Sequence, residues 1–147
     1  MNVFLIGWNV PNDGQAKAVA ELRNMIDRYP ILDANTVWSA GHSSQVFTAS
    51  IHEANEIAAP RVYVARSSNS AVLFDGFPIE QSGRFNALDA RDLRAFWPDL
   101  PGSLHGQFFA ARICFDIPRI EIINDFLGIY QAYYNQQNST WLISNSV

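Results

Sequence analysis

The chain opens with an apolar run, Asn2–Trp8, that lacks the polar alternation of a half-exposed strand. Such a run is typical of a strand buried on both faces. Turn residues fill positions 9–14, and apolar residues then recur at helical spacing through Gln15–Arg28, with Asp13 placed as a cap. Tyr29-Pro30 ends this helix, because proline cannot continue it. The pattern therefore predicts a central strand followed by a helix.

From Val37 onward the apolar positions alternate with a period of two, which predicts a series of short strands. Two segments between them, Gly41–Ser44 and Ser67–Ser70, have the composition of hairpin turns. Antiparallel pairing is therefore expected among these strands, which are predicted at Val37–Ala40, Gln45–Ile51, Arg61–Arg66 and Ala71–Phe74.

Helical spacing returns over Ala87–Trp97, where Asn86 is the expected cap and Pro98 the expected stop. The remainder is again β-rich, and the sequence contains no internal repeat or low-complexity linker. Periodicity alone therefore predicts an α+β fold in which two layers of sheet pack together. The last strands are expected at Gly106–Phe115, Arg119–Asp125, Ala132–Tyr134 and Thr140–Ser144.

Composition narrows the class of protein. The 147 residues are 48% hydrophobic and 16% charged, which suits one globular domain spanning residues 1–147. The net charge is −4 and no basic run occurs, so a nucleic-acid partner is not expected. No apolar stretch is long enough for a bilayer, and the single cysteine, Cys114, allows no internal disulfide. We therefore expect a cytoplasmic protein without a membrane partner.

Three segments late in the chain carry a resemblance to a known family. Leu104-x-Gly106-Gln107-Phe108 looks like a strand that starts at a close-packed glycine. Asp125-x-x-Gly128 followed by Tyr133-Tyr134 looks like a D-x-x-G-x-x-P-L-Y-Y segment, and Ser144-Asn145-Ser146 stands where the family has an Ala-Ser-Glu-like strand end. The chain thus resembles the N-terminal, class II glutamine amidotransferase domain of asparagine-synthetase-like proteins. This resemblance implies a four-layer α-β-β-α sandwich of two antiparallel sheets, the fold of N-terminal-nucleophile hydrolases.

The nucleophile that the resemblance implies is missing. Active members begin at a cysteine, whose thiolate attacks glutamine and whose α-amino group serves as the base. This chain begins Met1-Asn2, and the bulky Asn2 is expected to keep Met1 in place. Cys114 is predicted to lie inside a strand as a small buried residue, which disfavours a reactive thiol. No catalytic residue is therefore predicted.

The chain also departs from the family's pattern at the oxyanion site. Active members carry an Asn-Gly pair after a strand, and Asp75-Gly76 stands at the matching place. An ionised Asp75 would oppose a developing oxyanion, and the pair reads more simply as an ordinary turn. The Gln45–His52 strand also lacks the arginine that would bind the glutamine carboxylate. Asn2, Asp75 and Gly76 remain as candidates for a vestigial pocket.

Other sequence patterns that would indicate a metal, nucleotide or catalytic site are weak. His42, His52 and His105 lack the paired spacing of a metal site, and neither a nucleotide-binding loop nor a Gly-x-Ser-x-Gly elbow occurs. No metal or cofactor is therefore predicted. Asp125 follows an apolar strand and precedes Gly128, so its expected role is to orient a turn.

Three functions remain open. The first is a non-catalytic amidotransferase-like domain that supports an ATP-dependent, amide-forming synthetase domain or subunit, as in β-lactam synthetases and lasso-peptide cyclases. The others are an active glutamine-hydrolysing domain and a free-standing module that binds a small amino-acid-like ligand. The first predicts an exposed aromatic docking surface, so the isolated chain should self-associate or gain stability when its synthetase partner is added. The candidate residues are Tyr130, Tyr133, Tyr134 and Trp141, and the alternative is that all four belong to the core of the domain.

Overall fold

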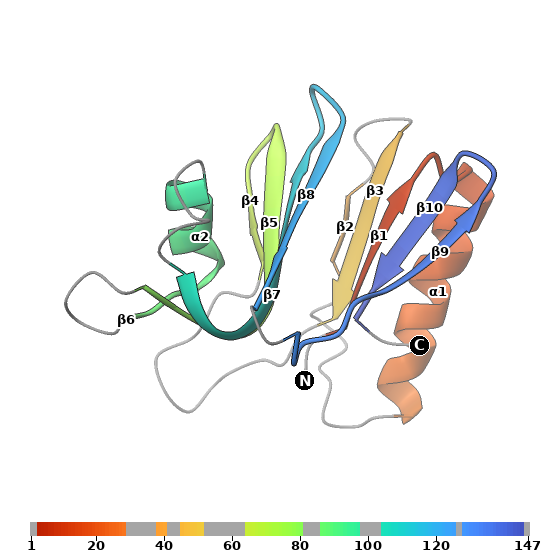
Figure 1. The fold of residues 1–147 in the computed structure, drawn as a ribbon. Helices are drawn as coiled ribbons and strands as arrows, with labels where there is room; N and C mark the ends of the chain where they lie inside the picture. The colour runs from red at the N-terminus through yellow and green to blue at the C-terminus, as the bar shows by residue number, and fades with distance from the viewer. Residues whose placement is uncertain are drawn as a thin grey trace. The chain divides into compact units, whose positions relative to one another are not determined.

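The chain divides into two compact units, which are described separately. The computed structural model describes residues 3–28, 38–40, 45–51, 64–80, 86–97, 104–125 and 128–145. The first unit combines Met1–Pro60 with Ala132–Val147, and the second is Arg61–Gln131. Each unit contains an antiparallel sheet and one described helix, so the α+β class is confirmed (Figure 1). No helix among the described residues is long and apolar enough to cross a membrane.

The sheet of the first unit is built around the start of the chain. β1 (Val3–Trp8) lies at its centre, with β3 (Val46–Ile51) on one side and β10 (Thr140–Ser144) on the other. β2 (Trp38–Ala40) and β9 (Tyr133–Gln137) form the outer strands. All four pairings are antiparallel. The prediction of a central first strand is therefore confirmed, as is the burial expected of it.

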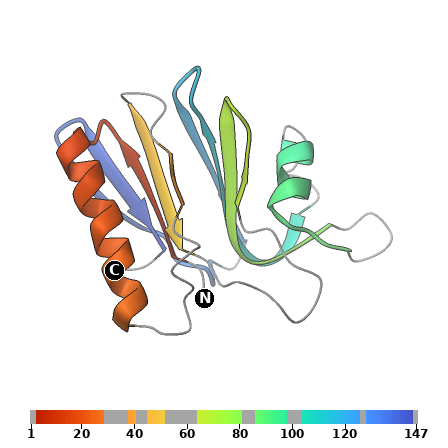
Figure 2. The same ribbon diagram turned by 180° about the vertical axis from the view of Figure 1, so that it is seen from behind.

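Helix α1 (Asn12–Arg28) covers one face of this sheet (Figure 2). The buried Leu22 of this helix packs against Val3, Phe47 and other apolar side chains of the sheet. The helix begins earlier than predicted, so Asp13 lies in its first turn and does not precede it. A carboxylate in the first turn still stabilises the positive end of the helix dipole.

The sheet of the second unit has the order β4-β5-β7-β8, and a short strand, β6, also pairs with β5. Its pairings are antiparallel, and β5 and β7 are matched along all of their eleven residues. The predicted Ser67–Ser70 hairpin turn is confirmed between β4 and β5. The strands are β4 (Val64–Arg66), β5 (Ser70–Glu80), β6 (Asn86–Ala87), β7 (Leu104–Cys114) and β8 (Arg119–Asn124).

Helix α2 (Ala90–Phe96) packs on one face of the second sheet, with Leu93 and Trp97 buried in the shared core. The predicted start was wrong, because Asn86 lies in β6 and Asp89 is the cap. The Asp89 carboxylate accepts the backbone N–H of Asp92 at 3.4 Å, and the Asp92 carboxylate accepts the backbone N–H of Asp89 at 3.0 Å. This reciprocal capping box stabilises a helix that begins at Ala90 and not at the predicted Ala87.

Candidate functional site

Asp75 and Gly76 do not form a turn. They lie in the middle of β5, opposite Phe109 and Phe108 of β7, so the sequence-based expectation of an ordinary turn was wrong. Full-length pairing with β7 overrides the local turn preference of an Asp-Gly pair. Asp75 is half-buried there, while Gly76 is buried. Asn2, the third member of the candidate vestigial pocket, lies outside the described residues.

Two glycines with positive φ bend the β5–β7 pair. Gly76 has φ +97° and Gly106 has φ +102°, a backbone conformation that side chains with a Cβ rarely adopt. A Cβ on Gly106 would fall on the carbonyl oxygen of Phe77, so the two backbones approach closely at this exposed glycine, the third residue of β7. Figure 2 shows β5 curving strongly in its second half.

The Asp125 turn lies beside this bend. The backbone N–H of Asp125 donates to Phe108 of β7 at 2.9 Å, and Gly128 donates to the Asp125 carbonyl at 3.0 Å. The buried Asp125 carboxylate accepts the backbone N–H groups of Ile129 at 3.0 Å and Tyr130 at 3.1 Å. The predicted turn-orienting role of Asp125 is therefore confirmed.

Two of the three motif segments, those that contain Gly106 and Asp125, lie beside Gly76 of β5, whereas the third, Ser144–Ser146, belongs to the first unit. We call this place in the second unit the glycine crossing: Gly76, Gly106, Phe108, Asp125 and Tyr130. The Asp125 turn brings the ring of Tyr130 over Gly76, where an added Cβ would approach the Tyr130 Cζ to 2.8 Å and the Phe108 Cα to 2.9 Å. The crossing contains neither a thiol nor an aliphatic hydroxyl that could attack glutamine. Its geometry therefore serves packing.

The strand where the family would carry a carboxylate-binding arginine is β3. Ser50 is buried there, and its hydroxyl makes no hydrogen bond to any residue that the structure describes. His52 and His42 lie outside the described residues, whereas His105 is exposed on β7. The described ranges hold no group of three or more His, Cys, Asp or Glu side chains placed to bind a metal ion.

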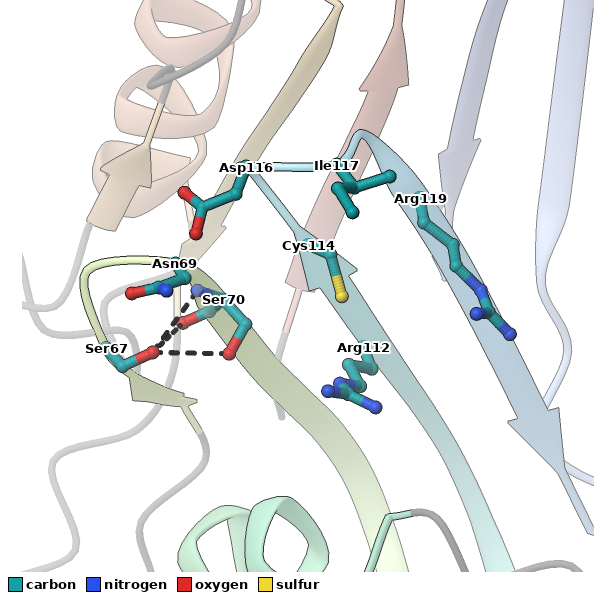
Figure 3. Close-up of a pocket in the computed structure, with 8 residues that line it drawn as sticks. All are labelled: Ser67, Asn69, Ser70, Arg112, Cys114, Asp116, Ile117 and Arg119. Carbon is teal, nitrogen blue, oxygen red and sulfur yellow. Dashed lines mark hydrogen bonds between the residues drawn. The ribbon is translucent and has the colours of Figure 1, made fainter.

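Cys114 differs from its sequence-based expectation. It is the last residue of β7 and is half-buried, because the register ends the strand at the Ser70–Cys114 pair. Cys114 lies in the wall of a pocket of about 510 Å³ (Figure 3). Periodicity within one strand gave no signal of this pocket, because its walls come from two hairpins that are distant in sequence.

The pocket has a firmly bonded frame. Ser67 closes the β4–β5 turn through its backbone N–H, which donates to the Ser70 carbonyl at 2.7 Å, and its hydroxyl accepts the Ser70 N–H at 3.2 Å. The backbone N–H of Phe115 donates to the Asn69 carbonyl at 2.8 Å, which ties this turn to the end of β7. Two arginines, Arg112 and Arg119, complete one side.

A separate surface lies on the hairpin of β9 and β10 in the first unit. Every residue of β9 is exposed, and Tyr134 stacks on Trp141 with ring centroids 5.9 Å apart. Tyr134 is 72% exposed, Tyr133 43% and Trp141 37%, so the alternative that all four candidate aromatics are core is wrong. Tyr130 is half-buried at the glycine crossing and does not belong to this surface.

Comparison of the sequence with models of known protein families gives no match, and neither does a search of curated proteins.

Proposed function

We propose that this chain is a non-catalytic amidotransferase-like domain that supports an ATP-dependent, amide-forming partner of the asparagine-synthetase type. The observation that carries the proposal is the glycine crossing. Two segments that resemble the amidotransferase family are separate in sequence, yet Phe108 of one and Asp125 of the other are joined by a backbone hydrogen bond beside Gly76. In this proposal the two antiparallel sheets form the inner layers of the four-layer sandwich that the resemblance implies.

The lack of chemistry at the same place supports a non-catalytic role. A glutaminase stabilises its oxyanion with hydrogen-bond donors, whereas β5 carries the carboxylate of Asp75 next to Gly76. Met1-Asn2 supplies no thiol, and Cys114 stands in the wall of a different site. A domain of this kind contributes a surface and stability to its partner, and it releases no ammonia.

The β9–β10 hairpin supports the second half of the proposal, a docking surface. The sequence has no charged residue between Asp125 and its end at Val147, and Tyr133, Tyr134 and Trp141 are exposed. Interfaces are depleted in charge and enriched in aromatic residues at their centres. β9 is also the outermost strand on its side of the sheet among the strands that the structure describes, and an outer strand is a common place for a partner strand to pair.

The first experiment incubates the pure chain with glutamine and measures ammonia against a heat-killed control. We expect no difference between the two samples. Ammonia release well above the control would overturn the non-catalytic assignment. A variant that begins with cysteine should also remain inactive, because Asp75 would still oppose the oxyanion.

The second experiment tests the partner. The synthetase domain of the resembling family carries a pyrophosphatase loop of Ser-Gly-Gly-x-Asp-Ser type. A polypeptide with such a loop, encoded in the same reading frame or beside it, should co-purify with the chain and raise its melting midpoint. The double substitution Tyr134→Ser and Trp141→Ser should abolish both effects. Ile117→Ser, which removes an exposed apolar residue of the second unit, should leave both unchanged. Failure of such a polypeptide to bind, with the chain monomeric and its midpoint unchanged, would refute the docking role.

A further inference from the structure

One side of the pocket beside Cys114 carries positive charge, as a site for small anions would. Arg112 and Arg119 both line it, and they share one counter-charge, Glu121 of β8. The Arg112–Glu121 pair is loose, with Nη1 and Oε2 3.5 Å apart, and that carboxylate oxygen makes no hydrogen bond to any of the described residues. Two guanidinium groups therefore face one carboxylate, which leaves most of their N–H donors available to a ligand.

Arg112 is the central residue of this side. Its side chain is 32% exposed, and among the residues that the structure describes Glu121 is the one polar partner of its guanidinium. A partly desolvated guanidinium binds carboxylate and phosphate groups strongly, because two parallel N–H donors match two oxygens. The remaining carboxylate of the lining, Asp116, points toward Asn69 and away from both arginines (Figure 3).

The size and rigidity of the pocket also suit a ligand. A volume of about 510 Å³ lies within the range of sites that bind small molecules. The hydrogen bonds between Ser67 and Ser70, together with the Phe115–Asn69 bond, hold its far wall in place. A pre-formed wall lowers the entropy cost of binding.

We propose that this pocket binds a small molecule through an oxyanion group, a carboxylate or a phosphate, held by Arg112 and Arg119 next to Cys114. The site is independent of the proposed docking function, because its residues belong to the second unit and the aromatic hairpin belongs to the first. Its ligand need not take part in any reaction on this chain.

Cys114 provides the assay, since it is the only cysteine in the sequence and lines the pocket. The rate at which an uncharged aromatic disulfide labels Cys114 is measured while inorganic phosphate or glutarate is titrated. We expect one of the two probes to slow labelling in a saturable manner. Saturation should be reached at concentrations up to about 10 mM, because a small probe held through one oxyanion group binds weakly. Protection by phosphate alone assigns a phosphate-bearing ligand, and protection by glutarate alone assigns a carboxylic acid.

Two variants locate the binding groups. Arg112→Gln and Arg119→Gln should each raise the probe concentration for half-protection by about tenfold, as expected when a charged hydrogen bond is lost. Arg23→Gln, which removes the same charge from the exposed side of α1, should have no effect. Circular dichroism establishes that each variant is folded. Absence of saturable protection of the unmodified chain by either probe would overturn the proposal, as would equal protection of the unmodified chain and both pocket variants.

Discussion

The substitution Gly76→Ala tests the glycine crossing directly. The added methyl would fall on the carbonyl oxygen of Gln107 and would lie 2.8 Å from the Tyr130 ring and 2.9 Å from the Phe108 Cα. Two of these neighbours are backbone atoms of a paired strand, which cannot move aside without loss of β-sheet hydrogen bonds. The same residue must also hold φ at +97°, which disfavours alanine.

The expected loss has two parts. A left-handed backbone costs a residue with a Cβ about 1–2 kcal/mol, and forcing an extra carbon into a packed site costs about 1–3 kcal/mol more. The free energy of unfolding should therefore fall by about 2–5 kcal/mol, a large share of the total for a chain of this size. The corresponding drop in melting midpoint is about 10 °C.

Two other glycines separate these parts. Gly128 also has positive φ, at +63°, but an added Cβ would meet nothing within 4 Å, so Gly128→Ala should cost about 1–2 kcal/mol. Gly14 lies in α1 and lacks the positive φ, so Gly14→Ala should stay within about 1 kcal/mol of the unmodified chain. Urea unfolding of the three variants ranks them. A Gly76→Ala variant that is no less stable than Gly128→Ala would refute the packing that we describe.

Further predictions concern the carboxylates and one arginine of the second unit. Asp125→Ala removes both acceptors of the Asp125 turn and should cost about 2–4 kcal/mol in urea unfolding, whereas Asp125→Asn keeps one acceptor and should cost less. Equal losses would show that the carboxylate does not order the turn. Asp89→Ala removes the cap of α2 and should cost about 1–2 kcal/mol, and the melting midpoint should fall accordingly. A hydrogen bond to Asp89, aided by its negative charge, raises the pKa of Arg91 above its ordinary value. When the folded-state pKa is the higher one, the contribution of the group to the free energy of unfolding is complete below the unfolded-state pKa and is lost only as pH rises through the folded-state pKa. Arg91→Gln should therefore change the free energy of unfolding equally at about pH 6 and about pH 9. A pH-dependent difference between these two conditions would contradict this assignment.

Local signals in the sequence predicted the elements that depend on local physics. The apolar run Asn2–Trp8 indicated the central strand, and the Asp125-x-x-Gly128 pattern indicated its turn, because both are determined by nearby residues. The start of α2 was missed although Asp89 and Asp92 carry capping-box spacing, a signal that could have been found. Asn86 also precedes this apolar stretch, so apolar spacing alone favours a cap that is three residues too early.

Features that depend on distant pairing could not be predicted from one sequence. β5 was expected to end at Phe74, since Asp75-Gly76 and Pro78 are turn residues, but β7 holds it in a strand through Glu80. The pocket beside Cys114 likewise depends on the register that pairs Cys114 with Ser70 and Arg119. Periodicity reports which residues alternate, and it does not report which strands meet.

The pairing of β1 with β10 has a consequence for biosynthesis. Leu5 pairs with Ser144, and the backbone N–H of Phe4 donates to the Asn145 side chain at 2.9 Å, so one neighbour of the central strand leaves the ribosome long after the central strand itself. The Arg61–Gln131 unit is complete before that strand emerges, and its sheet contains the hairpins β4–β5 and β7–β8, which need little loop closure. The second sheet should therefore form while the first still has an open edge along β1. A nascent chain that stalls before residue 140 would present that apolar edge to chaperones and to other nascent chains.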